Sequence, residues 1–208
     1  MPIRHALRNA LLACWWAVSF AALLGGCHSA SQSSLASAKI DSRAAAAEAI
    51  HLYDINGDAS LDATEVAACP AMKRASDRYD QDHNGQISRD EIAQHLQAIF
   101  GSGAGLLEVR CIVTRGGRPV SGAKVRFVPE RFLAVQEATA TTDAEGTAFP
   151  TVPPDQLPER LRNAAMMQPG LYRVEIEHSS LPAESTKGLG FEIDPTNRAG
   201  TTARFDLR

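Results

Sequence analysis

Two twelve-residue stretches, 54–65 and 80–91, share one spacing of oxygen-bearing side chains. In both, Asp or Asn stands at the first, third and fifth positions, a large aliphatic residue at the eighth and Glu at the twelfth. A short chain that wraps around one hard cation presents oxygens at these intervals, because alternate residues turn inward and the twelfth lies on the outgoing helix. Each stretch therefore predicts a helix, a cation-binding loop and a second helix.

The second stretch meets every positional requirement for calcium, which takes about six to eight oxygen ligands. Gly85 stands where the loop needs a left-handed residue, and Ile87 stands where two such loops pair through a short β-bridge. Asp90 is expected to be a solvated acid near a helix start, not a ligand. The expected ligands are Asp80, Asp82, Asn84, Gln86 through its carbonyl, Ser88 and Glu91.

The first stretch departs from this scheme at one position. Ala59 stands where glycine is expected, and a left-handed non-glycine residue costs about 1–2 kcal/mol. If this strain is felt only when the ion orders the loop, binding weakens about five- to thirtyfold relative to a glycine version. The first stretch has one more acid among its expected ligands than the second, which should strengthen calcium binding. Leu61 is expected to pair with Ile87. The expected ligands are Asp54, Asn56, Asp58, Ser60 through its carbonyl, Asp62 and Glu65.

Helices are expected on both sides of the two stretches. The ranges 43–53, 71–79 and 90–100 are rich in helix-favouring residues, and Pro70 suits the first position of a helix. Apolar faces at helical spacing contain Ala46, Ala49, Ile50, Tyr53, Ile92, His95, Leu96 and Ile99. The range 40–100 resembles the compact tandem EF-hands of bacterial secreted and surface proteins, which implies two calcium sites. A dockerin role is a minor alternative, since the characteristic dockerin helix residues are not evident.

Two roles for calcium remain open. A small helical pair has little core, so metal binding would supply folding free energy. A calcium sensor would instead open a Met-rich groove. The Ala-rich helices lack such a groove, which slightly favours the structural role. The Asp-rich turns would merely cap helices in a third interpretation, but two twelve-residue matches argue against it.

The N-terminus has the order of a secretory signal peptide over 1–26: a basic head, an apolar middle and small residues before Cys27. The apolar run is shorter than the about 20 residues of a membrane-spanning helix. The sequence Leu24-Gly25-Gly26-Cys27 resembles the lipobox of bacterial lipoproteins. This resemblance implies diacylation of Cys27 and anchoring of an exported protein to the inner or outer membrane of the cell envelope. Plain secretion is the alternative, and the Ser-rich range 27–39 is expected to be a flexible tether.

Beyond a glycine-rich linker at 101–105, apolar and polar residues alternate between Gly and Pro turns over 106–208, as is typical of strands. Acids outnumber bases before this linker and balance them after it, which also favours cation binding in the first half. The residues expected to point inward are Leu107, Val109, Cys111, Val113, Val125, Phe127, Tyr172, Val174, Ile176, Ala203, Phe205 and Leu207.

Turn-to-strand segments at 115–127, 142–149 and 169–176 resemble the carboxypeptidase regulatory-like (transthyretin-like) β-sandwich family. That resemblance implies a non-catalytic folding or adhesion module. The range 153–167 departs from the short connections of the family, and 155–165 within it is expected to form an inserted helix. The expected fold is thus two domains, a small all-α EF-hand pair followed by an all-β Ig/transthyretin-like sandwich.

The sequence does not point to a catalytic site. It contains no Gly-rich phosphate loop, no Gly-x-Ser-x-Gly nucleophile elbow, no Cys-x-x-Cys pair and no zinc-binding His-Glu-x-x-His helix. Cys111 is expected to be a buried hydrophobe, and a Cys69–Cys111 disulfide remains open. A net charge of −3 argues against nucleic-acid binding.

The expected function is a calcium-binding, lipid-anchored, non-enzymatic binding or structural display module of the envelope. Its candidate partners are calcium, the membrane through Cys27, and an envelope protein or polysaccharide. An accessory or regulatory subunit of an envelope enzyme, with calcium setting the domain arrangement, is the alternative. An unrecognised hydrolase is a third interpretation.

Overall fold

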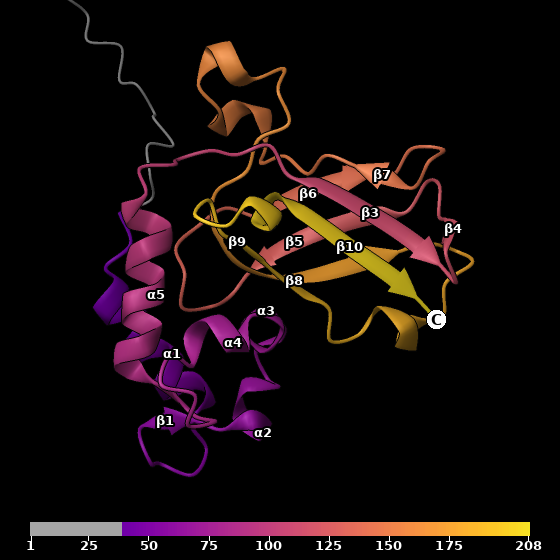
Figure 1. Ribbon diagram of the computed structural model, residues 1–208. Helices are drawn as coiled ribbons and strands as arrows, with labels where there is room; N and C mark the ends of the chain where they lie inside the picture. The colour runs from indigo at the N-terminus through magenta and orange to yellow at the C-terminus, as the bar shows by residue number, and fades with distance from the viewer. Residues whose placement is uncertain (1–38) are drawn as a thin grey trace, which may run out of the picture. The chain divides into compact units, whose positions relative to one another are not determined.

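A computed structural model describes residues 39–208 of the chain (Figure 1). The expected signal peptide, the lipidation site at Cys27 and nearly all of the Ser-rich tether lie outside the described residues. Within the described range, no helix combines the length and the apolar character needed to span a bilayer.

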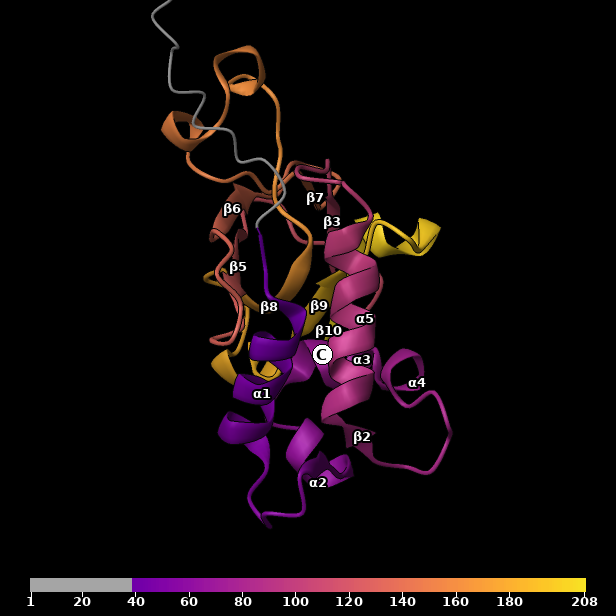
Figure 2. The ribbon, with the colours of Figure 1, turned by 90° about the vertical axis from the view of Figure 1, so that its left-hand side faces the viewer.

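Five α-helices occupy the first part of this range. The two longest, α1 and α5, pack against each other (Figure 2). The carboxylate of Asp41 caps α1, and Ser88 and Glu91 form a capping box at the start of α5. The helices are α1 (Ser42–Tyr53), α2 (Ala63–Val66), α3 (Pro70–Arg74), α4 (Ser76–Tyr79) and α5 (Arg89–Gly101). The single helix predicted over 71–79 is thus two short helices that meet at Ala75, and Pro70 opens α3 as predicted.

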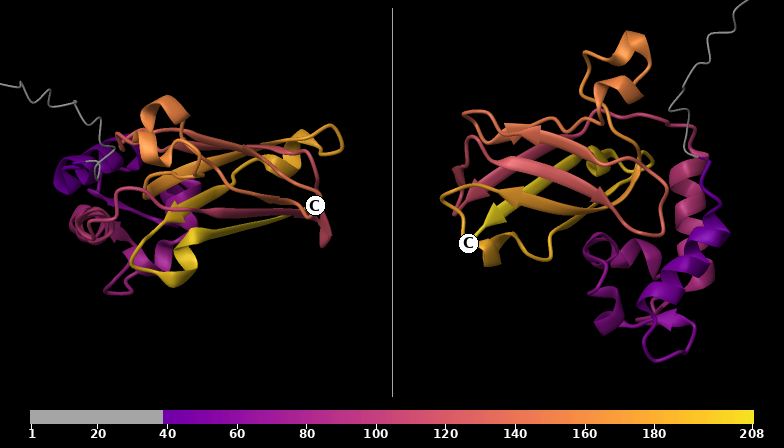
Figure 3. Two further views of the ribbon diagram at one scale, coloured as in Figure 1. Left: turned by 90° about the horizontal axis from the view of Figure 1, so that it is seen from above. Right: turned by 180° about the vertical axis from the view of Figure 1, so that it is seen from behind.

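Two four-stranded sheets follow, shown from above and from behind in Figure 3. One has the order β10-β3-β4, with β7 also paired to β3, and the other has the order β6-β5-β8-β9. Only the β10–β3 pair is parallel among the paired strands of the described chain. The strands are β3 (Arg110–Arg115), β4 (Arg118–Pro119), β5 (Lys124–Pro129), β6 (Ala138–Thr141), β7 (Thr147–Ala148), β8 (Gly170–Glu177), β9 (Gly190–Ile193) and β10 (Thr202–Leu207).

The predicted alternation along the strands is confirmed. All the residues expected to point inward are buried except Leu107, which is half-buried. Cys111 and Cys69 are both buried free thiols, so the open disulfide is not formed. Burial raises the pKa of the Cys111 thiol to about 12.

The predicted helix over 155–165 is wrong. Two short 3-10 helices, Pro154–Gln156 and Glu159–Leu161, stand there instead. Leu157, the residue before Pro158, is extended, because the proline ring disfavours a helical conformation in the residue that precedes it. Two further 3-10 helices, Ala183–Thr186 and Arg198–Thr201, connect the last strands.

The predicted division into an all-α pair and an all-β sandwich is also wrong. The fold is mixed α and β: α3 packs directly on β8 and β9, and helices and sheets share one apolar core. The described residues all belong to one compact unit. The helical part itself contains a two-stranded ladder of β1 (Ser60–Leu61) and β2 (Ile87–Ser88).

Gly190 explains how α3 comes so close to the sheet. A Cβ atom at this position of β9 would fall within the backbone of Pro70 and Ala71 at the start of α3. The helix therefore lies against the strand backbone where the strand has no side chain. The alternation of apolar and polar residues along the sequence does not predict this contact, because the two segments are far apart in the chain.

Replacing Gly190 with Ala should therefore destabilise the fold by about 1–3 kcal/mol, since α3 or β9 must move to admit the methyl group. Urea unfolding followed by circular dichroism measures the change. Gly101→Ala is the matched control, because its Cβ would meet only the mobile end of the Gln97 side chain. Equal stabilities of the two variants would contradict the proposed role of the close contact.

Candidate metal-binding loops

Three carboxylates converge in the second loop, residues 80–91. Oxygens of Asp80, Asp82 and Glu91 lie within 4.8 Å of one another. Asp80 ends α4 and Glu91 lies in the first turn of α5, so two helix ends position the outer carboxylates. Negative oxygens at this separation repel one another, and a cation between them removes that cost. The donor set, all oxygen, fits a hard divalent ion such as calcium.

Backbone N–H groups hold these carboxylates in place. Both oxygens of Asp80 accept hydrogen bonds from N–H groups inside the loop at 3.0 Å. Glu91 accepts from the N–H of Gln81 through Oε1 and from the N–H of Ser88 through Oε2, each at 2.8 Å. Burial raises the pKa of Glu91, but these hydrogen bonds outweigh it and lower the pKa below its ordinary value. The carboxylate is therefore ionised, which is the form that binds a cation.

The other expected ligands of the second loop lie around this cluster. The Asn84 amide donates to Asp82 at 2.9 Å, and the Ser88 hydroxyl donates to Glu91 at 2.8 Å. The Gln86 side chain accepts from the Ser60 hydroxyl at 2.9 Å, so it belongs to the contact between the loops. The backbone carbonyl of Gln86 remains the expected ligand atom.

The first loop, residues 54–65, repeats this pattern of internal bonds. Asp54 accepts from the N–H of Gly57 at 2.6 Å and from that of Ala59 at 2.9 Å. Glu65 accepts from the N–H of Ile55 at 2.8 Å through Oε1 and from that of Asp62 at 2.9 Å through Oε2. The first and last acids of this loop are thus tied to its backbone as their counterparts are in the second loop.

The middle ligand positions of the first loop are arranged differently. Hydrogen bonds from Ser60 lower the pKa of Asp58, which also accepts from the Asn56 amide at 3.1 Å. Asp62 caps α2 with its side chain. Among residues 39–208, the carboxylates of the first loop do not form a three-membered group as close as that of the second. The position that corresponds to Asp82 is Asn56, so the first loop has an amide where the second has its third carboxylate.

Each loop contains two left-handed residues, at its fourth and sixth positions. They are Gly57 (φ 77°) and Ala59 (φ 67°) in the first loop, and His83 (φ 58°) and Gly85 (φ 85°) in the second. The left-handed conformation predicted for Ala59 is confirmed. His83, which was not expected to be left-handed, bears the same kind of strain in the second loop. Backbone strain therefore does not rank one loop below the other.

A short antiparallel ladder joins the loops. Leu61 pairs with Ile87, as predicted, and Ser60 pairs with Ser88. Leu61 and Ile87 are both buried in the apolar core. The two loops are consequently fixed to each other by backbone and by side chains.

A second group of potential metal ligands, His95, Glu192 and Asp194, lies where the helices meet β9. Glu192 is buried and receives three donors. Tyr79 donates its hydroxyl to Oε1 at 2.6 Å, His95 Nε2 lies 3.0 Å from the same oxygen, and Arg78 forms an ion pair with Oε2. Burial opposes ionisation, yet these partners lower the pKa of Glu192. Because its charge is already matched by protein groups, this cluster fits a structural network better than a cation site.

A similar buried carboxylate stands near the first loop. Glu130 follows β5 and accepts the Tyr53 hydroxyl through Oε2 at 2.8 Å. Burial raises the pKa of Glu130, although Tyr53, Arg173 and the Cys69 thiol act in the opposite direction. Neither Glu130 nor Glu192 is singled out by a motif in the sequence. The one local sign of these contacts is a tyrosine directly before the first aspartate of each loop. The partner of each tyrosine becomes apparent only when the sheet is in place.

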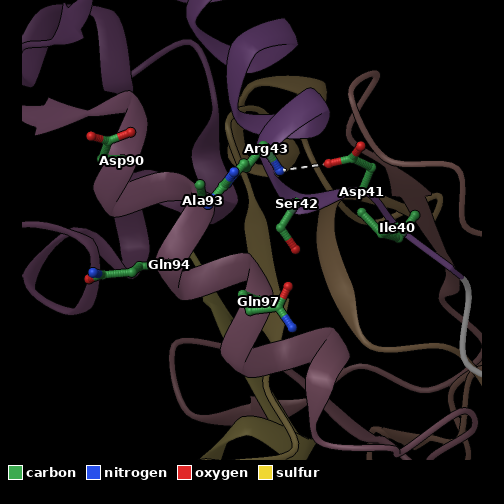
Figure 4. A pocket seen from close by; sticks show the side chains of 8 residues that line it. All are labelled: Ile40, Asp41, Ser42, Arg43, Asp90, Ala93, Gln94 and Gln97. Carbon is green, nitrogen blue, oxygen red and sulfur yellow. Dashed lines mark hydrogen bonds between the residues drawn. The ribbon is translucent and has the colours of Figure 1, made fainter.

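Two further places within residues 39–208 bring hydroxyl groups near polar side chains. A groove between the start of α1 and α5 is lined mostly by polar side chains (Figure 4). Ser42 lines it, but the Ser42 hydroxyl has no hydrogen-bond partner in the described part, so no base activates it. His178 and Ser180 are in contact at 2.7 Å, yet the same ring nitrogen accepts the Ser180 N–H at 3.2 Å. This exposed pair is a local turn.

No protein-family model matches the chain, and neither curated proteins nor solved structures include a significant match.

Proposed function

We propose that this protein binds calcium through both loops and acts as a non-catalytic module of the bacterial cell envelope. The observation that carries the proposal is the convergence of Asp80, Asp82 and Glu91 within 4.8 Å. The first loop is included in the proposal because Asp54 accepts from the N–H of the sixth loop residue, as Asp80 does, and Glu65 accepts from the N–H of the ninth, as Glu91 does. Twelve oxygen-bearing positions in two matched loops suit two calcium ions.

Calcium in these loops acts structurally in this proposal. The faces of α1 and α5 that a sensor would expose are packed: Ala46, Ala49, Ile92 and Leu96 are fully buried. Opening these helices would expose that core, which costs free energy for each apolar side chain uncovered. The ion instead offsets the repulsion between carboxylates and orders the loops.

Location in the envelope rests on the sequence alone. The lipobox-like segment and Cys27 support export and acylation, and the Ser-rich segment supplies reach between lipid and folded protein. The folded part of the proposed anchored module presents no acid–base or nucleophile pair suited to catalysis within residues 39–208. We therefore propose a binding or display role for it.

Titration calorimetry of the full chain in mild detergent should show about two calcium sites. Glu91→Gln should abolish the tighter site and Glu65→Gln the other, because each removes a carboxylate oxygen from the last ligand position. Asp90→Asn is the matched control and should leave both sites intact. Absence of calcium binding by the unmodified chain would refute the proposal.

The two strained positions allow each loop to be tuned separately. Ala59→Gly should tighten the first site and His83→Gly the second, each about five- to thirtyfold, because glycine adopts the left-handed conformation without steric cost. Calorimetry on Glu91→Gln and Glu65→Gln backgrounds isolates one site at a time. Unchanged calcium affinity in both glycine variants would contradict this prediction. It would show that the backbone strain at Ala59 and His83 is equal with and without the ion.

Acylation of Cys27 can be tested by feeding cells a fatty-acid analogue that carries a clickable group. The full chain should take up the label and fractionate with membranes, whereas Cys27→Ser should do neither. Labelling that persists in the variant would rule out Cys27 as the anchor.

A further inference from the structure

Both loops are entered directly from a tyrosine. Tyr53 precedes Asp54, and Tyr79 precedes Asp80, so each tyrosine is bonded to the first expected ligand of its loop. Each hydroxyl donates to a buried glutamate from the sheet region. Tyr53 reaches Glu130 Oε2 at 2.8 Å, and Tyr79 reaches Glu192 Oε1 at 2.6 Å.

The two glutamates belong to the same sheet. Glu192 lies in β9 and Glu130 follows the last residue of β5, and both of these strands pair with β8. The exposed fractions of Glu130 and Glu192 are 1% and 3%. Burying a carboxylate costs free energy unless it is hydrogen-bonded. The Tyr53 hydroxyl bonds Glu130 Oε2, while Glu130 Oε1 has no hydrogen-bond partner within the described residues. At Glu192 the Tyr79 hydroxyl acts together with His95 and Arg78.

Glu192 also reaches the helix that leaves its loop. Its partner His95 lies on α5, one turn beyond Glu91, the last expected ligand. The rings of His95 and Tyr79 pack with centroids 4.2 Å apart. One carboxylate of the sheet thus holds both helix ends from which the outer ligands of the second loop project.

We propose that the sheet positions the two calcium loops through these tyrosine–glutamate hydrogen bonds, with Glu130 the positioning residue of the first loop and Glu192 that of the second. The inference rests on the proposed function. A shift of either tyrosine moves the adjoining aspartate, because the two share one peptide unit. The coupling is reciprocal: an ion that fixes the aspartate also strengthens the contact of helix with sheet.

Removing one hydroxyl at a time tests this coupling. Tyr79→Phe should weaken calcium binding at the second loop about three- to tenfold and leave the first loop unchanged, and Tyr53→Phe should show the opposite pattern. Calorimetry of the full chain in detergent, on Glu65→Gln and Glu91→Gln backgrounds, measures each site alone. Tyr172→Phe is the matched control, since its hydroxyl donates to the Gln168 carbonyl inside the sheet region; it should change neither site.

Variants of the acceptor distinguish positioning from general stability. Glu130→Gln keeps an acceptor for Tyr53 and should keep first-loop affinity within about twofold, whereas Glu130→Ala should match Tyr53→Phe. Unchanged affinities in both phenylalanine variants, or equal weakening of both sites by either one, would overturn the inference. Those results leave calcium binding itself standing. Only an unmodified chain that binds no calcium would remove the proposed function as well.

Discussion

Burial of two carboxylates, Glu130 and Glu192, at the contact between helices and sheets constrains the arrangement of the described chain. A charge taken out of water is tolerated only when donors surround it. For Glu192 those donors come from α4 and α5. Glu130 is less fully paired: the hydroxyl of Tyr53, at the end of α1, bonds its Oε2, its Oε1 has no hydrogen-bond partner within the described residues, and burial raises its pKa. The helices therefore cannot move off the sheet without leaving a carboxylate unpaired. The glycine contact between β9 and α3 then sets how closely they approach.

The two loops reach one backbone shape with different residues. Both use left-handed conformations at the fourth and sixth positions, and each supplies one glycine and one residue with a side chain. The hydrogen bonds made by the first and last acids are also alike. What differs is the middle of each loop, where Asp82 joins the carboxylate cluster while Asp58 is engaged with Ser60. The loops thus differ in the placement of charge and are similar in backbone shape.

Local patterns could be predicted from the sequence, and contacts between distant segments could not. Oxygen spacing located both loops, period-two alternation identified the inward residues of the strands, and the pairing of Leu61 with Ile87 followed from their place in the loops. The mixed α and β core was missed because nothing local to Gly190 or to the two tyrosines indicates a partner 77 or more residues away. The inserted helix failed for a local reason, since Pro158 interrupts it.

The ladder of Leu61 and Ile87 joins the two loops edge to edge. Both residues are anchored in the apolar interior, whereas most of the residues between the first ligand position and the ladder are exposed in each loop. Fluctuations that open either loop can therefore begin at its exposed tip while this buried pair stays closed.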